Sequence, residues 1–309
     1  FSNEAKTFDD VHILNVKNNP DNNQTEIYLN GRKIDNTTGV TEVSRETLNF
    51  SSFINKPFYL GAGRYQLNGL PYETHLNGEI TEVFSFRDRK SETIQQRIYS
   101  YLAIKNGVSL HIPTSTLDDH RADWDYLDSD DQIIWSYSSN TLFNFDVTAI
   151  GKDNKSDLIQ KQSKSENSTS VVAIGLNRVE DLGTQNAERF DNDKDFLFWG
   201  HNGQDLNAYR TVINHDIGIA NAVRTNITRV NRVWKIEENT TTDISTTEVR
   251  VASIDFSGLP ALTTNREYVL MIADDENFNT NLETRIFYND GDFERASYNF
   301  DGIKYFTLG

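Results

Sequence analysis

Apolar residues alternate with polar ones in short runs along most of the chain. The first third contains four such runs: VHILNV at 11–16, TEIYLNGRKI at 25–34, KPFYLGAG at 56–63 and GEITEVFSF at 78–86. Alternation with a period of two places successive side chains on opposite faces, so each run predicts a β-strand or a hairpin. In the second run, Asn30-Gly31 tolerates the positive φ angles of a two-residue hairpin turn. We therefore expect antiparallel strands in this part of the chain.

The segment 91–106, SETIQQRIYSYLAIKN, has helical periodicity instead. Its residues Ile94, Ile98, Tyr101 and Leu102 follow the spacing i, i+4, i+7 and i+8, which forms one apolar stripe on a helix. Ser91 is a suitable N-cap, and the next residue after the segment, Gly107, can end the helix in a left-handed conformation. A single helix after a run of strands must lay its stripe on a sheet or between two domains.

The remainder of the chain returns to strand-like runs separated by turn residues. These runs are QIIWSY, FDVTAIG, TSVVAIGL, KDFLFWG, RVNRVWKIEE, TEVRVASIDF, EYVLMIAD, TRIFYN and IKYFTLG. Their spacing is typical of an antiparallel sandwich. We therefore predict an all-β fold of tandem antiparallel β-sandwiches with one connecting α-helix. The first domain would occupy residues 1–112 and end in the helix, a linker 113–123 would follow, and the second sandwich would occupy 124–309.

Composition narrows the classes of partner. Among 309 residues, 46 are acidic and 30 are basic, which gives a net charge of −16. Such an acidic surface repels phosphate backbones and anionic lipid, so we expect no nucleic-acid partner. No apolar run approaches the roughly 18–20 residues needed to cross a bilayer, which predicts no direct membrane insertion. The chain has no cysteine, so disulfides, thiolate nucleophiles and Cys-ligated zinc are excluded.

Catalytic motifs find little support in the sequence. A retaining glycosidase needs two carboxylates about 5 Å apart, which alternate positions of one strand can supply. Glu79 and Glu82 are three positions apart and would lie on opposite faces of a strand. The chain lacks G-x-S-x-G and H-E-x-x-H motifs, and its six histidines do not cluster. We predict that the protein is not an enzyme.

Several acidic loops could supply ligands for a metal ion. DNDKDF places Asp191, Asp193 and Asp195 at alternate positions, a pattern that suits the oxygen-rich shell of Ca²⁺. An EF-hand is excluded because the sixth position is Phe196 and the twelfth is Asn202. A weaker candidate is Asp274, Asp275 and Glu276, and further acidic loops lie at 128–131 and 290–292. Calcium is therefore the one cofactor to consider, and a solvated turn is the alternative for each loop.

Two further features bear on ligand binding. Trp135, Trp199 and Trp234 lie inside strand-like runs, which favours core packing over a platform that stacks on sugars, whereas Trp124 is the one we expect to be exposed. The polar segment 151–167, GKDNKSDLIQKQSKSEN, fits either a ligand-facing loop or an edge strand protected by lysines. We favour the edge strand.

The helical segment also carries a family resemblance. NGEITEVFSFRDRKSETIQQRIYSYLAIKNGVSL resembles the closing segment of a concanavalin-like (LamG-type) jelly-roll lectin domain in secreted proteins of Bacteroidota. In those proteins the last strand leads into a helix that ends in a Tyr-Leu-Ala-x-Lys-x-Gly pattern, matched here by YLAIKNG at 101–107. The hairpin TEIYLNGRKI is similar to one in the same family.

The rest of the chain resembles an uncharacterised β-rich domain that often follows this lectin unit. The segments that carry the similarity are IIWSYS, VTAIGKDNKSDLIQKQSKSEN, FLFWGHNG, RVWKIEE, YVLMIADDENF and YFTLG. About 110 residues are too few for a complete jelly roll of roughly 150–200 residues, so we expect N-terminal strands outside this chain. We also expect no signal peptide within it and a sorting domain beyond YFTLG.

The resemblance implies export by the type 9 secretion system, with that machinery as a partner, and an extracellular or cell-surface location. Some similar proteins are adhesins used in gliding motility. We therefore expect a non-catalytic adhesion module whose lectin-like domain binds an extracellular polysaccharide or glycan. Two alternatives stay open: a structural spacer (stalk) that carries an active region elsewhere in a longer protein, and an accessory part of a polysaccharide-degrading enzyme.

Overall fold

A computed structural model describes most of the chain in two compact units. The described residues are 11–19, 24–33, 60–67, 70–110, 125–207, 209–215, 225–240, 243–262 and 266–309. The first unit comprises Phe1–Asn15, Tyr28–Asp35 and Glu92–Gly309, and the second comprises Val16–Ile27 and Asn36–Ser91.

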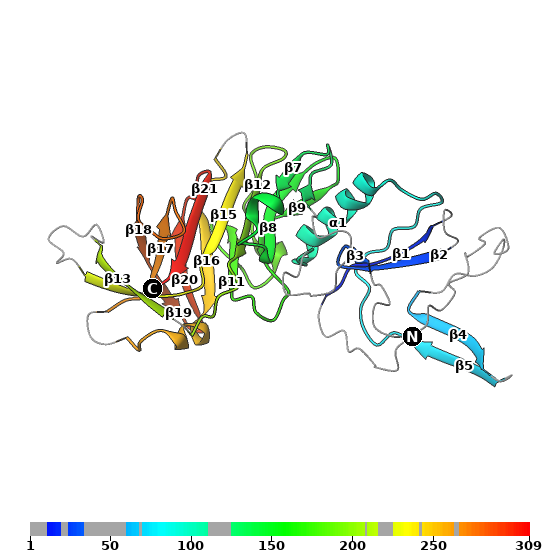
Figure 1. Cartoon of the computed structure of the whole chain (residues 1–309), viewed down its shortest axis with the longest axis horizontal. Helices are drawn as coiled ribbons and strands as arrows, with labels where there is room; N and C mark the ends of the chain where they lie inside the picture. The colour runs from blue at the N-terminus through cyan, green and yellow to red at the C-terminus, as the bar shows by residue number, and fades with distance from the viewer. Residues whose placement is uncertain are drawn as a thin grey trace. The chain divides into compact units, whose positions relative to one another are not determined.

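Two antiparallel sheets form the centre of the first unit (Figure 1). The seven-stranded sheet has the order β18 (Glu283–Ile286), β17 (Val269–Ala273), β21 (Ile303–Leu308), β15 (Trp234–Asn239), β12 (Phe196–His201), β8 (Phe145–Asp153) and β9 (Leu158–Gln160). The five-stranded sheet has the order β10 (Gln162–Lys164), β11 (Val172–Leu176), β16 (Thr247–Ala252), β20 (Phe293–Tyr298) and β19 (Tyr288–Asp290). Three 3-10 turns lie between strands: η2 (Ser138–Asn140), η3 (Gly183–Gln185) and η4 (Ser253–Gly258).

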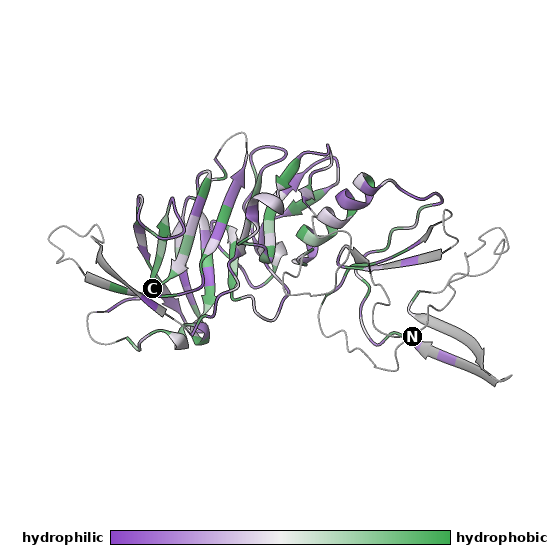
Figure 2. Cartoon of the chain, viewed as in Figure 1, coloured by the Kyte–Doolittle hydropathy of each residue, from purple (hydrophilic) through white to green (hydrophobic). Residues whose placement is uncertain are grey.

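The main hydrophobic core contains side chains from both sheets. Ile236 and Phe306 come from the seven-stranded sheet and Ile174 and Val249 from the five-stranded one, and all four are fully buried. Trp234 stacks on Phe306 with ring centroids 5.4 Å apart. Apolar and polar residues alternate along several strands, as the period of two requires (Figure 2). The predicted all-β sandwich fold is confirmed.

The seven-stranded sheet is covered on its outer face too, by a third layer. This layer consists of helix α1 (Glu92–Asn106) and the short pair β6 (Tyr126–Leu127) and β7 (Ile133–Trp135). In β12, Leu197 and Trp199 belong to the main core, whereas Phe196 and Phe198 belong to a second core with residues of α1. Every residue of β12 is therefore buried, which explains the apolar run Phe196–Trp199.

The helix buries a different face from the predicted one. Its buried residues are Gln95, Tyr99, Ser100, Ala103 and Ile104, whereas the predicted stripe Ile94, Ile98, Tyr101 and Leu102 is only half-buried. The polar Ser100 fits this face because its Oγ donates to Gln96 O (2.8 Å) and accepts from Leu127 N–H (2.9 Å). The periodicity missed this face because it weighs side-chain polarity and not hydrogen bonds made after folding.

The helix belongs to the same compact unit as the sheets that follow it. It contacts β8, β9 and β6, and its buried side chains belong to the second core. The same unit includes Phe1–Asn15 and Tyr28–Asp35, and the predicted domain bounds 1–112 and 124–309 stay a prediction. The predicted linker 113–123 and Trp124 lie outside the described residues.

The N-terminal third contains short antiparallel pieces. Strands β1 (Leu14–Asn19), β2 (Gln24–Leu29) and β3 (Arg32–Lys33) form one small sheet, and β4 (Ala62–Leu67) pairs with β5 (Leu70–His75). The predicted turn between β2 and β3 is confirmed, with positive φ at both Asn30 (50°) and Gly31 (81°). The predicted strand at 78–86 is absent, since residues 76–91 have no ladder partner in the described part of the chain.

Strands β13 (Tyr209–His215) and β14 (Thr225–Val230) form a separate antiparallel pair. Ile227 of β14 lies in a third core with Val269 and Met271, on the outer face of β17. This core covers the outer face of the seven-stranded sheet at the end away from α1. In the described residues, no helix is both long and apolar enough to cross a bilayer.

Candidate functional site

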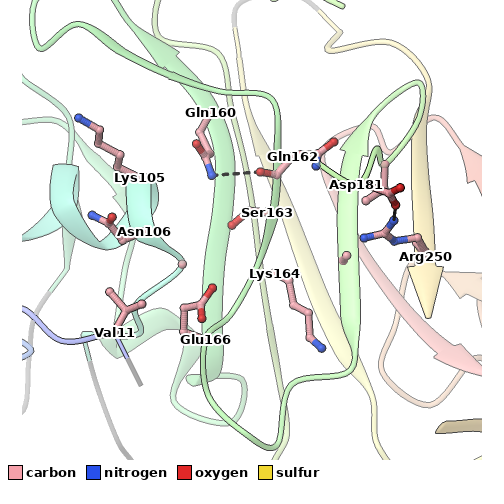
Figure 3. A pocket seen from close by; sticks show the side chains of 13 residues that line it. Val11, Lys105, Asn106, Gln160, Gln162, Ser163, Lys164, Glu166, Asp181 and Arg250 are labelled. Atoms are coloured by element: carbon pink, nitrogen blue, oxygen red, sulfur yellow. Dashed lines mark hydrogen bonds and ion pairs between the residues drawn. The ribbon is translucent and has the colours of Figure 1, made fainter. Parts of the chain in front are cut away.

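A polar groove of about 410 Å³ lies between the end of α1 and the strands β10, β11 and β16 (Figure 3). Lys105 and Asn106 line it from the helix side, and Asp181 and Arg250 line it from the opposite side. The other lining residues are Val11, Gly107, Gln160, Gln162, Ser163, Lys164, Glu166, Ala173 and Val179. These described residues include no aromatic side chain, so recognition in this groove would rest on charge and hydrogen bonds.

The segment 151–167 builds one side of the groove. It leaves the edge of one sheet as β9 and enters the edge of the other as β10, with Lys161 alone between them. Gln162 fixes the crossing, because its side-chain amide donates to Glu180 O and accepts from Glu180 N–H, both at 2.8 Å. The expected edge-strand character of this segment is confirmed, and its side chains also face the groove (Figure 3).

Gly107 brings the end of α1 close to β10. Its φ of +66° and the bond from Val108 N–H to Ala103 O (3.0 Å) form the Schellman type of helix cap. Gly107 O accepts from Glu166 N–H at 2.9 Å, and a Cβ at this position would lie 2.4 Å from Lys164 O. The predicted left-handed cap is therefore confirmed, and it also sets the width of the groove.

Arg250 is a partly buried cation of the groove. Its side chain is 15% exposed, and its guanidinium lies 4.4 Å from the ring centroid of Phe293. Burial and the neighbouring charge of Arg295 lower the pKa of Arg250. Its buried Nη1 has no hydrogen-bond partner among the described residues, and the nearest carboxylate, Asp181 Oδ1, is 3.7 Å away. The Asp181 side chain is 87% exposed, so this pair is weakly held.

Two of the acidic loops proposed from the sequence meet around one lysine. Lys194 Nζ lies 2.9 Å from Asp153 Oδ2, 3.3 Å from Asp130 Oδ2 and 3.6 Å from Asp128 Oδ2. It also donates to Ser129 Oγ. The side chains of Asp153 and Asp128 are almost fully buried, whereas that of Asp130 is half-exposed. We call these five residues the Lys194 cluster.

Mutual stabilisation of charge is visible in this cluster. Burial alone would raise the pKa of Asp153, but hydrogen bonds from Lys194 and Ser129 hold it below its usual range. Burial alone would likewise lower the pKa of Lys194, and the hydrogen bond and charge of Asp153 raise it instead. An ammonium group thus supplies the positive charge at the point where the loops converge.

The predicted calcium ligands do not converge on one point. Asp195 is buried and its Oδ2 accepts from Asn192 N–H (3.1 Å), whereas Asp191 and Asp193 are exposed. Asp193 Oδ1 accepts instead from the backbone N–H of Asn154 at 2.7 Å. Across the described ranges, no three or more His, Cys, Asp or Glu side chains form a group that could hold a metal ion. Calcium binding stays a prediction.

The weaker candidate loop is organised by its own backbone. Asp275 Oδ2 accepts from Asn279 N–H (2.9 Å) and Thr280 N–H (2.6 Å). Burial opposes ionisation of Asp275, but these backbone donors lower its pKa. Asp274 Oδ1 pairs with Lys304 Nζ at 2.5 Å, and Glu276 is exposed. The two aspartates hold the turn in shape.

A buried Asp–His pair lies on β8 and β12. His201 Nε2 lies 2.8 Å from Asp146 Oδ2, and His201 Nδ1 accepts from Gly203 N–H at 2.9 Å. The second bond requires Nδ1 without a proton, so Nε2 carries it and donates to Asp146. Both ring nitrogens are thus engaged and the imidazole is 2% exposed. The pair has no free nitrogen that could act as a general base.

The environment of the pair keeps His201 neutral and Asp146 ionised. Burial lowers the pKa of His201, and the hydrogen bond to Asp146 offsets only part of that effect. Burial alone would raise the pKa of Asp146, but hydrogen bonds from His201, Asn167 and Thr169 hold it below its usual range. These bonds join β8 and β12 to the turn that precedes β11. The pair is a structural connection.

The protein is thus an antiparallel β-sandwich that has a covering helix and a charged surface groove. A family model described as "Domain of unknown function (DUF8202)" matches residues 94–302, more than half of the chain. The chain belongs to this family. Searches of curated proteins and of solved structures gave no match.

Sequence reasoning identified part of this site. It singled out the segment 151–167, and it placed Trp135, Trp199 and Trp234 in the core, where each is at most 2% exposed. It missed Arg250, because a single arginine in TEVRVASIDF follows the ordinary alternation of a strand. The flanking Val249 and Val251 are part of the same alternation, so no local signal separates Arg250 from a solvated strand residue.

Proposed function

We propose that this protein is a non-catalytic extracellular binding module that serves adhesion and holds a glycan in the groove at the end of α1. The observation that carries the proposal is the groove's lining of amide, carboxylate, ammonium and guanidinium groups. Such groups recognise hydroxyl-rich ligands through directed hydrogen bonds. Apart from Val11 and the helix end at 105–107, the lining of this groove comes from the sandwich strands and turns between Gln160 and Arg250.

The buried Asp–His pair supports a non-catalytic role. Its imidazole is enclosed and fully hydrogen-bonded, so it cannot reach a substrate proton without local unfolding. The extracellular location, Bacteroidota origin and type 9 export rest on the sequence resemblance. We propose this location, origin and export route together with the binding function.

A structural spacer is the second candidate function. It is favoured by the burial of Trp135, Trp199 and Trp234, which removes three possible platforms for sugar stacking. A spacer needs only a rigid sandwich and no ligand. The two candidates therefore differ in one measurable property, which is saturable binding of a glycan.

The test is binding of the intact protein to a panel of neutral and acidic polysaccharides, with calcium and with chelator. Two variants locate the binding. Lys164→Trp adds an indole to the groove at an exposed position whose side chain makes no hydrogen bond or ion pair within the described part of the chain. Ile286→Trp places the same indole at an exposed position on β18, at the opposite edge of the seven-stranded sheet.

We expect saturable binding that Lys164→Trp weakens at least tenfold and Ile286→Trp leaves unchanged. Absence of binding to every polysaccharide, with and without calcium, would contradict the proposal and leave the spacer. Equal binding by both variants would remove the groove as the site. A melting temperature that is the same in calcium and in chelator would argue against the predicted calcium ion.

A further inference from the structure

The groove has a charge balance opposite to that of the whole protein. Its lining contains three cations, Lys105, Lys164 and Arg250, and two carboxylates, Glu166 and Asp181. The local sum is therefore +1, whereas the chain carries −16. A cationic groove on an acidic surface is where an anionic ligand meets the least repulsion.

Arg250 has the chemistry for such a ligand. Its guanidinium is held against Phe293, so its donors are fixed in direction and less side-chain entropy is lost on binding. A buried donor without a partner is costly, and an ionised acceptor from a ligand would remove that cost. Arg250 Nη1 is in this condition within the described part of the chain.

Asp181 marks the direction from which a carboxylate can approach. Its carboxylate reaches Arg250 Nη1 from solvent, at 3.7 Å, which is longer than a hydrogen bond. Glu248, a further acidic neighbour, is already paired, because it lies 2.5 Å from Arg295 and both side chains are buried. A ligand carboxylate can therefore replace Asp181 without competing with a tightly held internal pair.

Lys164 adds a second cation on β10 of the same sheet, where Ala173 of β11 is the cross-strand partner of both Lys164 and Arg250. The Lys164 side chain is exposed, and it forms no hydrogen bond or ion pair with the part of the chain that the structure describes. Asp255 interacts with it electrostatically, and burial raises the pKa of Asp255 while Lys164 lowers it. Figure 3 shows the side chains of Lys164 and Arg250 among those that line the groove.

We propose that the groove selects glycans that carry carboxylates, with Arg250 as the specificity-determining residue, Lys164 as its auxiliary cation and Asp181 as a competing internal anion. This inference rests on the proposed function and specifies its ligand class. The absence of an aromatic platform in the described lining fits it, because a charged substituent can replace stacking as the source of affinity.

The experiment compares one oligosaccharide in two charge states. Binding of the intact protein to oligogalacturonate and to its methyl ester, at equal length, is measured by calorimetry, with a sulfated oligosaccharide as a third probe. Four variants are compared: Arg250→Lys, Lys164→Ala, Asp181→Asn and, as a matched control on β18, Arg285→Gln. The melting temperature of each variant checks that it folds. If Arg250→Lys does not fold, Lys164→Ala still tests the inference, because Lys164 is exposed.

We expect the acid form to bind about tenfold more tightly than the methyl ester, with affinity that falls as salt is added. Arg250→Lys should weaken the acid form about tenfold and Lys164→Ala a few-fold, whereas Asp181→Asn should strengthen it. Arg285→Gln should change nothing. Stronger binding of the sulfated probe than of the carboxylate would overturn the selection for carboxylates.

Equal binding of the acid and the methyl ester would overturn this inference while the proposed glycan binding stands. The inference is overturned as well if the acid form binds but responds to neither Arg250→Lys nor Lys164→Ala. No binding of any probe, nor of any polysaccharide in the earlier panel, would instead remove the proposed function itself.

Discussion

At the scale of single residues, Gly107 combines two requirements at one position. It needs a positive φ to end the helix, and it needs the absence of a side chain to let β10 approach. Gly302 also has a positive φ, of 64°, but a Cβ there would meet nothing within 4 Å. The two glycines therefore separate the cost of backbone conformation from the cost of steric contact.

The first prediction uses this pair. We expect Gly302→Ala to lower the free energy of unfolding by about 1–2 kcal/mol, the usual cost of a left-handed non-glycine residue. Gly107→Ala should cost more, about 3 kcal/mol or above, because overpacking against the Lys164 carbonyl adds to it. Urea denaturation of the intact protein measures both. Equal losses would mean that the approach of β10 to the helix end is looser than the structure has it.

His201 makes a residue-scale prediction about pH. Its pKa in the folded state is lower than in the unfolded chain, so the unfolded state binds the proton first as pH falls below about 6.5. The folded state therefore loses stability on acidification through this range. Asp146 acts in a lower window, because its depressed pKa contributes stability above about pH 4 that is lost as pH falls further.

We expect the melting temperature of the wild type to fall between pH 7.5 and pH 5, and His201→Gln to lose much of that pH dependence while being less stable at pH 7.5. His75→Gln is the control, because the His75 side chain is 71% exposed. A pH profile unchanged by His201→Gln would show that another group controls the acid limb.

At the scale of elements, the Lys194 cluster ties three loops together without a metal ligand set. Its lysine comes from the turn before β12, Asp153 ends β8, and Asp128 and Asp130 follow β6. The turn's shape depends on a positive φ at Lys194, of 65°. The positive charge between these loops is the ammonium group of Lys194.

The third prediction concerns this lysine. Lys194→Met leaves the buried Asp153 and Asp128 without a cation, and we expect a loss of about 2–3 kcal/mol, since partial exposure of Lys194 lets water screen the pair. Lys155→Met is the control, because Lys155 pairs with the half-exposed Asp130 and should cost clearly less. Thermal unfolding at neutral pH and well below pH 4 adds a check. The penalty should shrink once Asp153, whose pKa is depressed, is protonated.

At the scale of the whole molecule, helix α1 forms part of the outer layer that covers the seven-stranded sheet of the family domain. The family match begins at residue 94, inside α1, and the compact unit begins again at Glu92. Tyr99, Ala103 and Ile104 cover Phe196 and Phe198 in the second core. The helix is therefore a structural part of the sandwich.

The fourth prediction compares two fragments, 88–309 and 113–309. Both lack Ile13 and Tyr28 of the second core, so their difference isolates residues 88–112. We expect the shorter fragment to melt at a lower temperature and to bind a hydrophobic dye, because each large apolar side chain that the helix no longer covers exposes surface worth roughly 1.5–3 kcal/mol. Identical melting curves would mean that the helix only rests on the sheet.

The sequence by itself determined the strand-rich fold, the hairpin turn at Asn30-Gly31, the helix with its cap at Gly107 and the burial of three tryptophans. These features depend on local periodicity, on φ preferences and on the size of apolar side chains, which neighbouring residues alone express. Periodicity was wrong where it needed a partner: residues 78–86 alternate, but a strand exists only when a ladder forms beside it.

Tertiary structure decided which helix face is buried, why β12 is apolar on both sides and where the acidic loops meet a lysine. It also placed Arg250, Lys164 and Asp181 around one groove, although 17 positions separate Lys164 from Asp181 and 69 separate Asp181 from Arg250. Such placements depend on strand order and on hydrogen bonds between distant segments. The pattern along a chain carries no record of which strand will lie beside which, so these contacts arise only when the sheets assemble.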